Sequence, residues 1–204
     1  MRAKFITLEG IEGSGKTTSI KSINNLLEQK KIRYINTREP GASSMGNELR
    51  EILLNPNTNI SSEVELLLML ADRKDHVEKT ILPNLLNDTW VISDRFMDSS
   101  IAYQGGGRQL DLSMINSLAT YLNLPTPDST LLFDLPVEIA LERTKKRGKL
   151  DRFEKEEIEF HNRVRDAYLE LANDNPDRIK VIDGTQNLEQ VQAKVIENIN
   201  QLFR

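Results

Sequence analysis

The 204-residue sequence contains no cysteine. This absence excludes disulfides, thiolate zinc sites and cysteine nucleophiles, and it fits a reducing compartment. Long apolar runs are also absent, since no window approaches the roughly 18 residues that a membrane span needs. The first apolar run is broken by Thr7 and Glu9, before the apolar region of a signal peptide would be complete. We therefore expect a cytoplasmic protein without a membrane segment.

An excess of positive charge is lacking as well. The chain carries 27 Lys and Arg against 31 Asp and Glu, a formal net charge of −4. This balance argues against broad electrostatic docking on nucleic acid or on an anionic membrane, so we expect neither as a partner. Any anionic ligand must instead meet a local cluster of basic side chains.

What the sequence does contain is a regular alternation of short β-rich runs and longer helical stretches. Strands are expected at 4–8, 33–37, 90–93, 130–134 and 178–182, and helices at 16–29, 46–54, 62–86, 112–121, 137–147, 155–173 and 188–203. This order predicts an α/β fold of three layers (α/β/α), with a five-stranded parallel sheet between helices. No linker divides the chain, so residues 1–204 are expected to form one domain.

Four segments between these elements are expected to be irregular, at 37–44, 55–61, 98–111 and 148–153. In open α/β sheets the connections at the carboxyl ends of the strands carry the ligands. Candidate binding residues are therefore sought first in these segments.

The segment from Gly10 to Thr17 matches the phosphate-binding motif G-x-x-x-x-G-K-[ST], and it lies between an expected strand and an expected helix. Its glycines let backbone N–H groups converge on phosphate oxygens, and the helix adds its positive end. Lys16 supplies charge to the β- and γ-phosphates, and Thr17 can ligate the bridging Mg²⁺. The sequence therefore predicts a P-loop NTPase fold, with these residues at the triphosphate: Gly10, Ile11, Glu12, Gly13, Ser14, Gly15, Lys16, Thr17 and Thr18.

A second magnesium residue is expected to be an aspartate that ends an apolar strand. Asp94 and Asp134 both fit this pattern. Arg95, beside Asp94, adds a phosphate-binding cation at the same strand end, whereas Pro136 after Asp134 fits a plain strand-to-helix turn. This comparison favours Asp94 without excluding Asp134.

A P-loop names the phosphoryl donor and leaves the acceptor open. The nearest match to a guanine-reading N/T-K-x-D motif, 144–147, lacks the aspartate, which argues against a GTPase. Five other segments are informative together: TREPG (37–41), ADR (71–73), DRF (94–96), DSSIAYQGGGR (98–108) and LDRFE (150–154). With the P-loop, they make nearly the whole chain resemble the bacterial thymidylate kinases. The resemblance implies ATP-dependent conversion of dTMP to dTDP, a nucleoside monophosphate kinase fold and a homodimer.

The resemblance also implies roles for individual residues at the acceptor. It places Arg95 and Arg50 at the dTMP phosphate, with Arg38 and Glu39 beside it. It places Arg73 and Gln104 at the thymine ring, with a hydroxyl of Ser99 or Ser100. Tyr103 would lie at the sugar, and Glu12 would face the acceptor. The chemistry agrees, because arginine donates two hydrogen bonds to a phosphate and an amide can both donate and accept. Read alone, the 98–108 glycines could form a flexible turn, and Arg73 could be a solvated charge on a helix.

Two positions depart from the family pattern. Met69 stands where relatives commonly place a phenylalanine that stacks on thymine, and Ala42 replaces the second glycine of TREPGG. Methionine keeps an apolar, polarizable contact but lacks the flat ring. Met69 is therefore expected at the base with weaker stacking; the alternative is an ordinary core methionine.

The segment 142–153 is strongly basic, with six cations and one acid between residues 143 and 152. It could be a solvated helix end, because cations suit helix C-termini. We favour a short mobile lid that closes over the triphosphate, with Arg143 beside adenine and Arg147 or Arg152 at the transferred group. The catalytic set is then Lys16, Arg95, Arg147, Arg152 and Glu12.

The stretch 62–86 is apolar over more than one helix stripe, which core packing alone or core packing with a homodimer interface would explain. His76 and His161 are single residues on expected helices, and we expect structural or surface roles for both. Two rival functions stay open at this point. One is a kinase for another monophosphate or for a deoxynucleoside, and the other is a module that holds ATP without turnover.

Overall fold

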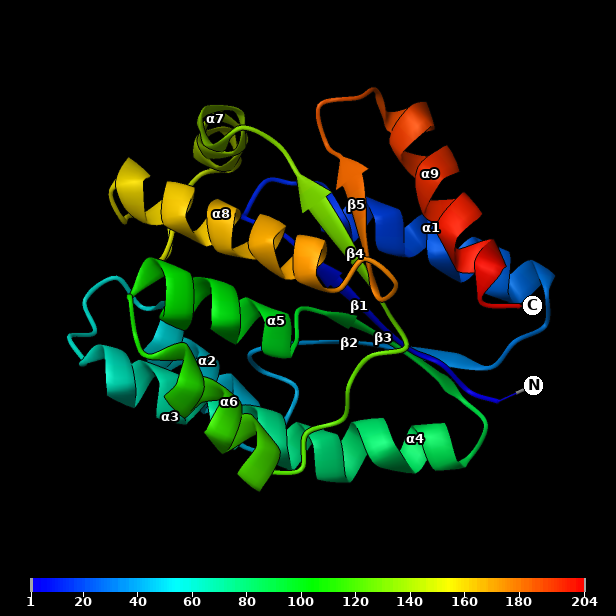
Figure 1. Ribbon diagram of the computed structural model, residues 1–204, viewed down its shortest axis with the longest axis horizontal. Helices are drawn as coiled ribbons and strands as arrows, with labels where there is room; N and C mark the ends of the chain where they lie inside the picture. Colours follow the sequence, from blue (N-terminus) through cyan, green and yellow to red (C-terminus); the bar gives the residue numbers. More distant parts are fainter. Residues whose placement is uncertain (1, 204) are drawn as a thin grey trace.

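The computed structural model describes residues 2–203, apart from the side chain of Arg147, and it shows a parallel sheet between helices (Figure 1). The strands are β1 (Phe5–Glu9), β2 (Tyr34–Arg38), β3 (Trp90–Asp94), β4 (Ser129–Asp134) and β5 (Ile179–Asp183). Their order is β2-β3-β1-β4-β5, and every pairing is parallel. The predicted α/β fold is confirmed, and the strand ends differ from the predicted ones by no more than one residue.

The helical elements surround this sheet. They are α1 (Lys16–Gln29), α2 (Gly46–Leu54), α3 (Ser62–His76), η1 (Val77–Ile81), α4 (Leu82–Leu86), α5 (Met97–Ser100), η2 (Ile101–Gly107), α6 (Leu112–Tyr121), α7 (Val137–Arg147), α8 (Ile158–Asp174) and α9 (Leu188–Gln201), with η marking π-helical turns. Helices α1 and α9 lie side by side on one face of the sheet (Figure 1). Among the described residues, no helix is both long and apolar enough to cross a membrane.

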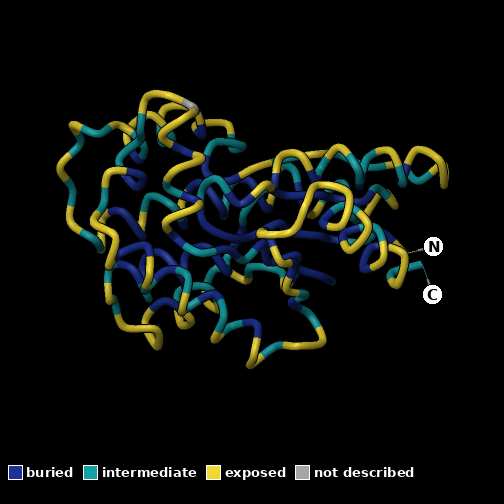
Figure 2. Tube along the Cα trace, turned by 90° about the horizontal axis from the view of Figure 1, so that it is seen from above, coloured by how far each residue is buried: buried dark blue, intermediate teal, exposed yellow. Residues whose placement is uncertain are grey.

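Apolar side chains of the strands alternate between the two faces, because successive residues of a strand point in opposite directions. Ile6 and Leu8 of β1 pack with Ile23 of α1 and Val195 of α9. Phe5, the residue before Ile6, points to the opposite face and packs with residues of η1 and β3. Both faces of the sheet are therefore covered, and Figure 2 shows buried segments at the centre of the trace and exposed segments mainly at its outside.

Three expected helices differ from the prediction, and the last of them, expected at 188–203, ends at Gln201. The expected helix 62–86 is helical throughout, but it contains the π-helical turn η1 between α3 and α4. The expected helix 155–173 begins only at Ile158, because the preceding residues form a turn around Asp151. In that turn Asp151 accepts hydrogen bonds from the backbone N–H groups of Phe153 and Glu154.

The expectation of an irregular segment at 98–111 was wrong, because most of it is helical in α5 and η2. The glycines of η2 permit close packing and do not form a flexible turn. A Cβ on Gly106 would lie 2.6 Å from Cβ of Ala167 in α8, and one on Gly107 would lie 2.5 Å from the ring of Phe160. The segment is therefore held against α8, and it presents its side chains from a fixed backbone.

The carboxyl ends of β1, β3 and β4 form one edge of the sheet. These neighbouring strands end in Glu9, Asp94 and Asp134. Strand β1 lies between β3 and β4, so the chain crosses over in opposite directions on either side of it. A ligand crevice is expected at such a switch point, outside the carboxyl ends of the strands.

A buried ion pair holds α5 against the sheet. Arg178, just before β5, donates from Nη1 to Oδ2 of Asp98 at 2.6 Å and from Nη2 to Oδ1 at 2.9 Å. Its Nη1 also donates to Oγ1 of Thr130 at 2.9 Å. This bidentate pair fixes the start of the segment that carries Ser99, Ser100 and η2.

We expect Arg178→Ala to lower the free energy of unfolding by about 2–4 kcal/mol, because it leaves the buried Asp98 carboxylate without its cation. Urea denaturation followed by circular dichroism measures this change. Lys194→Ala is the matched control, since it breaks an ion pair with Glu197 whose side chains are 50% and 57% exposed, and it should cost less than about 1 kcal/mol. Equal, small losses in both variants would contradict the stabilising role of the buried pair.

Candidate active site

The P-loop connects β1 to α1 through backbone that only glycine adopts easily. Gly10 has φ 130°, Gly13 φ 78° and Gly15 φ 100°. A Cβ on Gly10 would clash with the carbonyl oxygen of Phe133 in β4, and one on Gly13 would lie 2.6 Å from the carbonyl oxygen of Ala140 in α7. The loop therefore lies tightly against β4 and α7, and Gly15 is the N-cap of α1.

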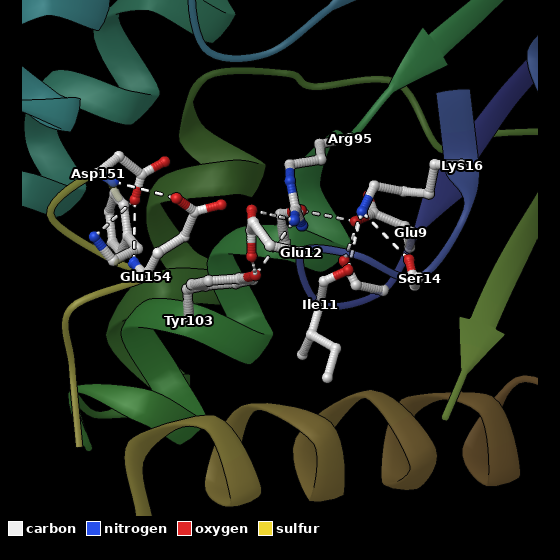
Figure 3. Close-up of polar contacts among 12 residues, drawn as sticks. Glu9, Ile11, Glu12, Ser14, Lys16, Arg95, Tyr103, Asp151 and Glu154 are labelled. Carbon is white, nitrogen blue, oxygen red and sulfur yellow. Dashed lines mark hydrogen bonds and ion pairs between the residues drawn. The ribbon is translucent and has the colours of Figure 1, made fainter. Parts of the chain in front are cut away.

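Lys16 is folded onto its own loop. Its Nζ donates to the carbonyl oxygens of Gly10 (2.9 Å) and Ile11 (3.1 Å), and to Oγ of Ser14 (3.4 Å), as Figure 3 shows. Burial, reinforced by the nearby positive charge of Arg95, lowers the pKa of Lys16 to about 8. A negatively charged ligand beside the Lys16 ammonium would raise the pKa of Lys16 back toward its usual value.

A cavity of about 460 Å³ opens beside the P-loop, within the size range of small-molecule sites. It brings together most of the residues predicted from the sequence. The predicted residues that line it are Glu12, Gly13, Gly15, Lys16, Thr17, Thr18, Arg38, Glu39, Arg50, Met69, Arg73, Asp94, Arg95, Ser99, Ser100, Tyr103 and Gln104. Gly10, Ile11 and Ser14 belong to the same loop but do not line the cavity. The residues predicted for the donor and those predicted for the acceptor thus line one cavity.

Arg95 links the P-loop to η2, because it contacts both Glu12 and Tyr103. It follows β3 with φ 73°, a left-handed conformation that is uncommon outside glycine. Its Nη2 donates to Oε1 of Glu12 at 2.5 Å and to the Tyr103 hydroxyl at 3.1 Å, and the Tyr103 hydroxyl donates to Oε2 of Glu12 (Figure 3). Burial opposes ionisation of Glu12, but the charges of Arg95 and Lys16 outweigh it and lower the pKa of Glu12 to about 2.

Sequence reasoning missed Glu9 and Tyr168. Arg95 donates a hydrogen bond to the Tyr168 hydroxyl, which in turn donates to Glu9. Glu9 is fully buried at the end of β1 and accepts from the Phe96 N–H (2.7 Å), Ser99 Oγ (2.6 Å) and the Tyr168 hydroxyl (2.8 Å). Burial, reinforced by the charge of Asp98, raises the pKa of Glu9 to about 7. An acidic residue at the end of a buried strand was the available signal for Glu9, whereas Tyr168 on α8 carried none.

Arg73 is buried in a network of hydrogen bonds, so the alternative of a solvated helix charge is wrong. Its Nε donates to Oε2 of Glu39 at 2.5 Å, its Nη1 to Ser100 Oγ at 2.8 Å, and its Nη2 to the Phe96 carbonyl at 2.9 Å. The other oxygen of Glu39 contacts Nδ1 of His76 at 2.8 Å. Glu39 thereby fixes Arg73 beside the cavity, and His76 has the structural role expected for it.

The structure distinguishes Asp94 from Asp134, the two candidate magnesium ligands between which the sequence left the choice open. Asp134 is paired with Arg165, whose Nε and Nη2 donate to it at 2.6 and 2.9 Å. Asp94 lines the cavity, and its buried Oδ1 has no hydrogen-bond partner among the described residues. A buried carboxylate oxygen without a partner fits a cation ligand, so the geometry favours Asp94.

The remaining acceptor-side residues lie around the cavity in different settings. Arg50 lines the cavity and donates from Nη1 to the Pro40 carbonyl at 2.6 Å, while Arg38 is exposed at the end of β2. Met69 is half-buried. It lines the cavity, as a contact to the base requires, and it also packs on the apolar cluster that contains Phe153, as a core methionine would. Asp151 and Phe153 also line the cavity and were not predicted.

Of the predicted lid arginines, Arg143 and Arg152 are described by the structure, and neither lines the cavity. Arg152 donates from Nε to the Leu53 carbonyl at 2.8 Å and from Nη1 to Oε2 of Glu65 at 2.7 Å. Arg143 reaches the Gly13 carbonyl at 3.3 Å. The side chain of Arg147 lies outside the described part of the structure. The segment that contains Arg152 is thus attached to α2 and α3 in this arrangement.

Three comparisons with known proteins agree with this geometry. A family model described as thymidylate kinase matches residues 8–195. The chain is 50% identical over 192 residues to a thymidylate kinase of Carboxydothermus hydrogenoformans, covering 94% of each protein. It is 47% identical over 204 residues to a thymidylate kinase of Nitrosospira multiformis, covering all of both.

A solved structure shows the same fold over the same length. The crystal structure of thymidylate kinase from Ehrlichia chaffeensis superposes with a TM-score of 0.80 at 34% sequence identity, covering 98% of this chain and 99% of that one. Family model, sequence identity and fold therefore coincide over nearly the whole chain, and the chain belongs to the thymidylate kinase family.

Proposed function

We propose that the protein transfers the γ-phosphoryl group of ATP to dTMP and so forms dTDP. The observation that carries this proposal is the single cavity that joins a P-loop at one end to a group of arginines, Arg38, Arg50, Arg73 and Arg95, at the other. The two nucleotides are both anionic, and such an arrangement binds them end to end. Family membership supports the same activity.

The donor is held by the P-loop. Backbone N–H groups around Gly13 and Gly15, the positive end of α1 and the Lys16 ammonium surround the phosphates. Thr17 and Asp94 fit the accompanying Mg²⁺, since both line the cavity and Asp94 Oδ1 is buried without a partner among the described residues. Bound with ATP, this ion would supply positive charge that offsets the negative charge of the triphosphate. Arg143, at Gly13, lies where it can support the adenine.

The acceptor phosphate is held by Arg95, Arg50 and Arg38. Arginine is suited to this task, because its planar group donates paired hydrogen bonds and stays charged. Glu12 and Tyr103 hold Arg95 in place until the phosphate arrives, and Tyr103 then lies at the sugar. No general base is needed, because the acceptor phosphate is already ionised near neutral pH. The residues therefore align the two groups and balance their charge.

Arg73 and Gln104 address the thymine ring, with Ser99 and Ser100 beside them and Met69 supplying an apolar contact. Arg73 and Gln104 are buried in contacts that fix their positions, as base recognition requires. Met69 offers contact without a flat ring, so we propose that thymine preference rests more on these polar groups than on stacking.

The lid supplies charge during transfer. Arg152 and Arg147 are the candidates for the transferred phosphoryl group, and for Arg152 this role requires the lid to move, because its Nη1 is bonded to Glu65 in this structure. Closure of the lid would also exclude water from the reacting groups.

We further propose a cytoplasmic homodimer. Val64 and Leu67 of α3 and Leu112 and Met114 of α6 are large apolar side chains that stay exposed in one copy of the chain. Helices α3 and α6 share an apolar cluster, so these side chains belong to adjoining helices that a second copy could cover.

A coupled ADP-release assay tests the proposed function most simply. With ATP and Mg²⁺, we expect dTMP to stimulate ADP release strongly, dUMP less, and dCMP, dGMP and thymidine little, because the arginines need a phosphate and the base site needs thymine. ATP alone gives the background rate. ADP release that no monophosphate stimulates would refute the kinase and leave a protein that only holds ATP. A higher rate with another monophosphate or with thymidine would instead indicate a different acceptor.

Arg152→Ala should lower kcat for dTMP by about 10³-fold while dTMP affinity changes much less, because arginines that reach a transferring phosphoryl group contribute about 10³–10⁵ to the rate. Lys149→Ala, which removes the same unit charge from an exposed lid position, is the control and should keep kcat near the wild-type value. Steady-state kinetics with calorimetric dTMP titration separates the two effects. An unchanged kcat for Arg152→Ala would remove this role from Arg152.

Binding of an unreactive MgATP analogue should take up close to one proton at pH 9 and little at pH 7. The pKa of Lys16 is lowered to about 8, so the free site has lost most of this proton at pH 9, and the bound phosphates restore it. Calorimetry in buffers of different ionisation enthalpy counts the protons. The affinity should fall as the pH rises above 8. No uptake at pH 9 would show that Lys16 does not meet the phosphates.

A further inference from the structure

Glu65 connects the base end of the cavity to the lid. It lies in the first turn of α3 and is 1% exposed. Its Oε1 accepts from Nε2 of Gln104 at 2.8 Å, and its Oε2 accepts from Nη1 of Arg152 at 2.7 Å and from Nε of Arg108 at 3.1 Å. One buried carboxylate therefore contacts both a residue of the base site and two arginines.

This contact fixes which end of the Gln104 amide faces the cavity. A carboxylate in ion pairs with Arg108 and Arg152 offers only acceptor oxygens. The Gln104 amide must therefore turn its NH₂ group toward Glu65, because the opposite orientation would place two oxygens at hydrogen-bond distance. Among the described residues, none donates a hydrogen bond to Oε1 of Gln104, and Gln104 lines the cavity. The amide thus offers the cavity an acceptor.

Arg73 offers the complementary donor. Its Nε, its Nη1 and one hydrogen of Nη2 are directed to Glu39, Ser100 and the Phe96 carbonyl, and the second hydrogen of Nη2 has no partner among residues 2–203 outside the Arg147 side chain. A pyrimidine-2,4-dione such as thymine presents an N3–H donor next to the O4 acceptor. A 4-aminopyrimidine such as cytosine reverses both, with an N3 acceptor next to an amino donor.

We propose that Glu65 is a positioning residue for base selection: it locks the Gln104 amide so that the cavity accepts from N3–H and rejects 4-aminopyrimidines. This inference rests on the proposed function, since it assigns a cause to the base preference of that same site. The contacts of Glu65 with Gln104 and Arg108 do not involve Arg152. The lock therefore does not depend on the position of the lid.

The test is the ratio of kcat/KM for dTMP to kcat/KM for dCMP in Glu65→Gln. Glutamine at this position both donates and accepts, so the Gln104 amide can adopt either orientation and accept either base. We expect the ratio to fall about tenfold or more, because a wrong base no longer leaves buried polar groups unpaired. Both substrates are measured on one sample, so the folded fraction and any loss of rate through Arg152 cancel in the ratio.

Two further variants separate amide orientation from general disturbance of the network. Glu156→Gln removes the other carboxylate that pairs with Arg108, at 2.6 Å and 28% exposed, without a contact to Gln104, and it should leave the ratio unchanged. Glu65→Asp keeps an acceptor-only group and should retain most of the ratio even where kcat falls. An unchanged ratio in Glu65→Gln, or an equal fall in Glu65→Asp, would overturn the proposal.

A measurement on the unmodified protein decides the question if Glu65→Gln does not fold. In ¹⁵N-labelled wild-type protein saturated with dTMP, the Gln104 side-chain NH₂ should show nuclear Overhauser contacts to the Glu65 methylene protons. Loss of these contacts, with new ones from this NH₂ to the thymine base, would overturn the proposal. Wild-type protein that does not phosphorylate dTMP at all would instead refute the proposed function, so the two failures are distinguishable.

Discussion

The ion pair between Arg95 and Glu12 is the interaction on which the rest of the site depends. It joins the P-loop to the carboxyl end of β3, with Arg95 in a left-handed conformation and Tyr103 bonded to both partners. Glu9 supports this arrangement by accepting from the backbone of Phe96 and from Ser99. If Arg95 binds the acceptor phosphate as proposed, that phosphate competes with the Glu12 carboxylate, which Arg95 already contacts in the free protein. The cations are thereby held in place in the free protein.

The sheet provides the geometry for this competition. Strand β1 ends at Glu9 between β3 and β4, so the P-loop and Arg95 leave neighbouring strands at the same edge. Helix α8 closes the other side through Tyr168 and through its close approach to the glycines of η2. The buried carboxylates of Asp98 and Glu65 are tolerated because each accepts hydrogen bonds from several donors. Stability and function thus draw on the same contacts.

Much of this arrangement could be predicted from the sequence, because the alternation of strands and helices, the P-loop and its lysine follow from local patterns. The order of the strands in the sheet was not predicted. The resemblance added the acceptor residues, and all of them line the cavity. What could not be predicted depends on contacts between distant segments. The glycines of η2 resemble a flexible turn until the packing of α8 is known, and Glu65 resembles an ordinary helix residue until Gln104, Arg108 and Arg152 meet it. Glu9 and Tyr168 were missed for the same reason.

The central claim is that two anionic nucleotides lie end to end in one cavity whose cations outweigh their repulsion. The most direct measurement is the affinity of a molecule in which adenosine and thymidine are joined by a chain of phosphates, compared by calorimetry with those of ATP and dTMP. If both sites are filled together, the joined molecule should bind at least about 100-fold more tightly than the better of the two nucleotides. An affinity no higher than that of the better single nucleotide would contradict the account.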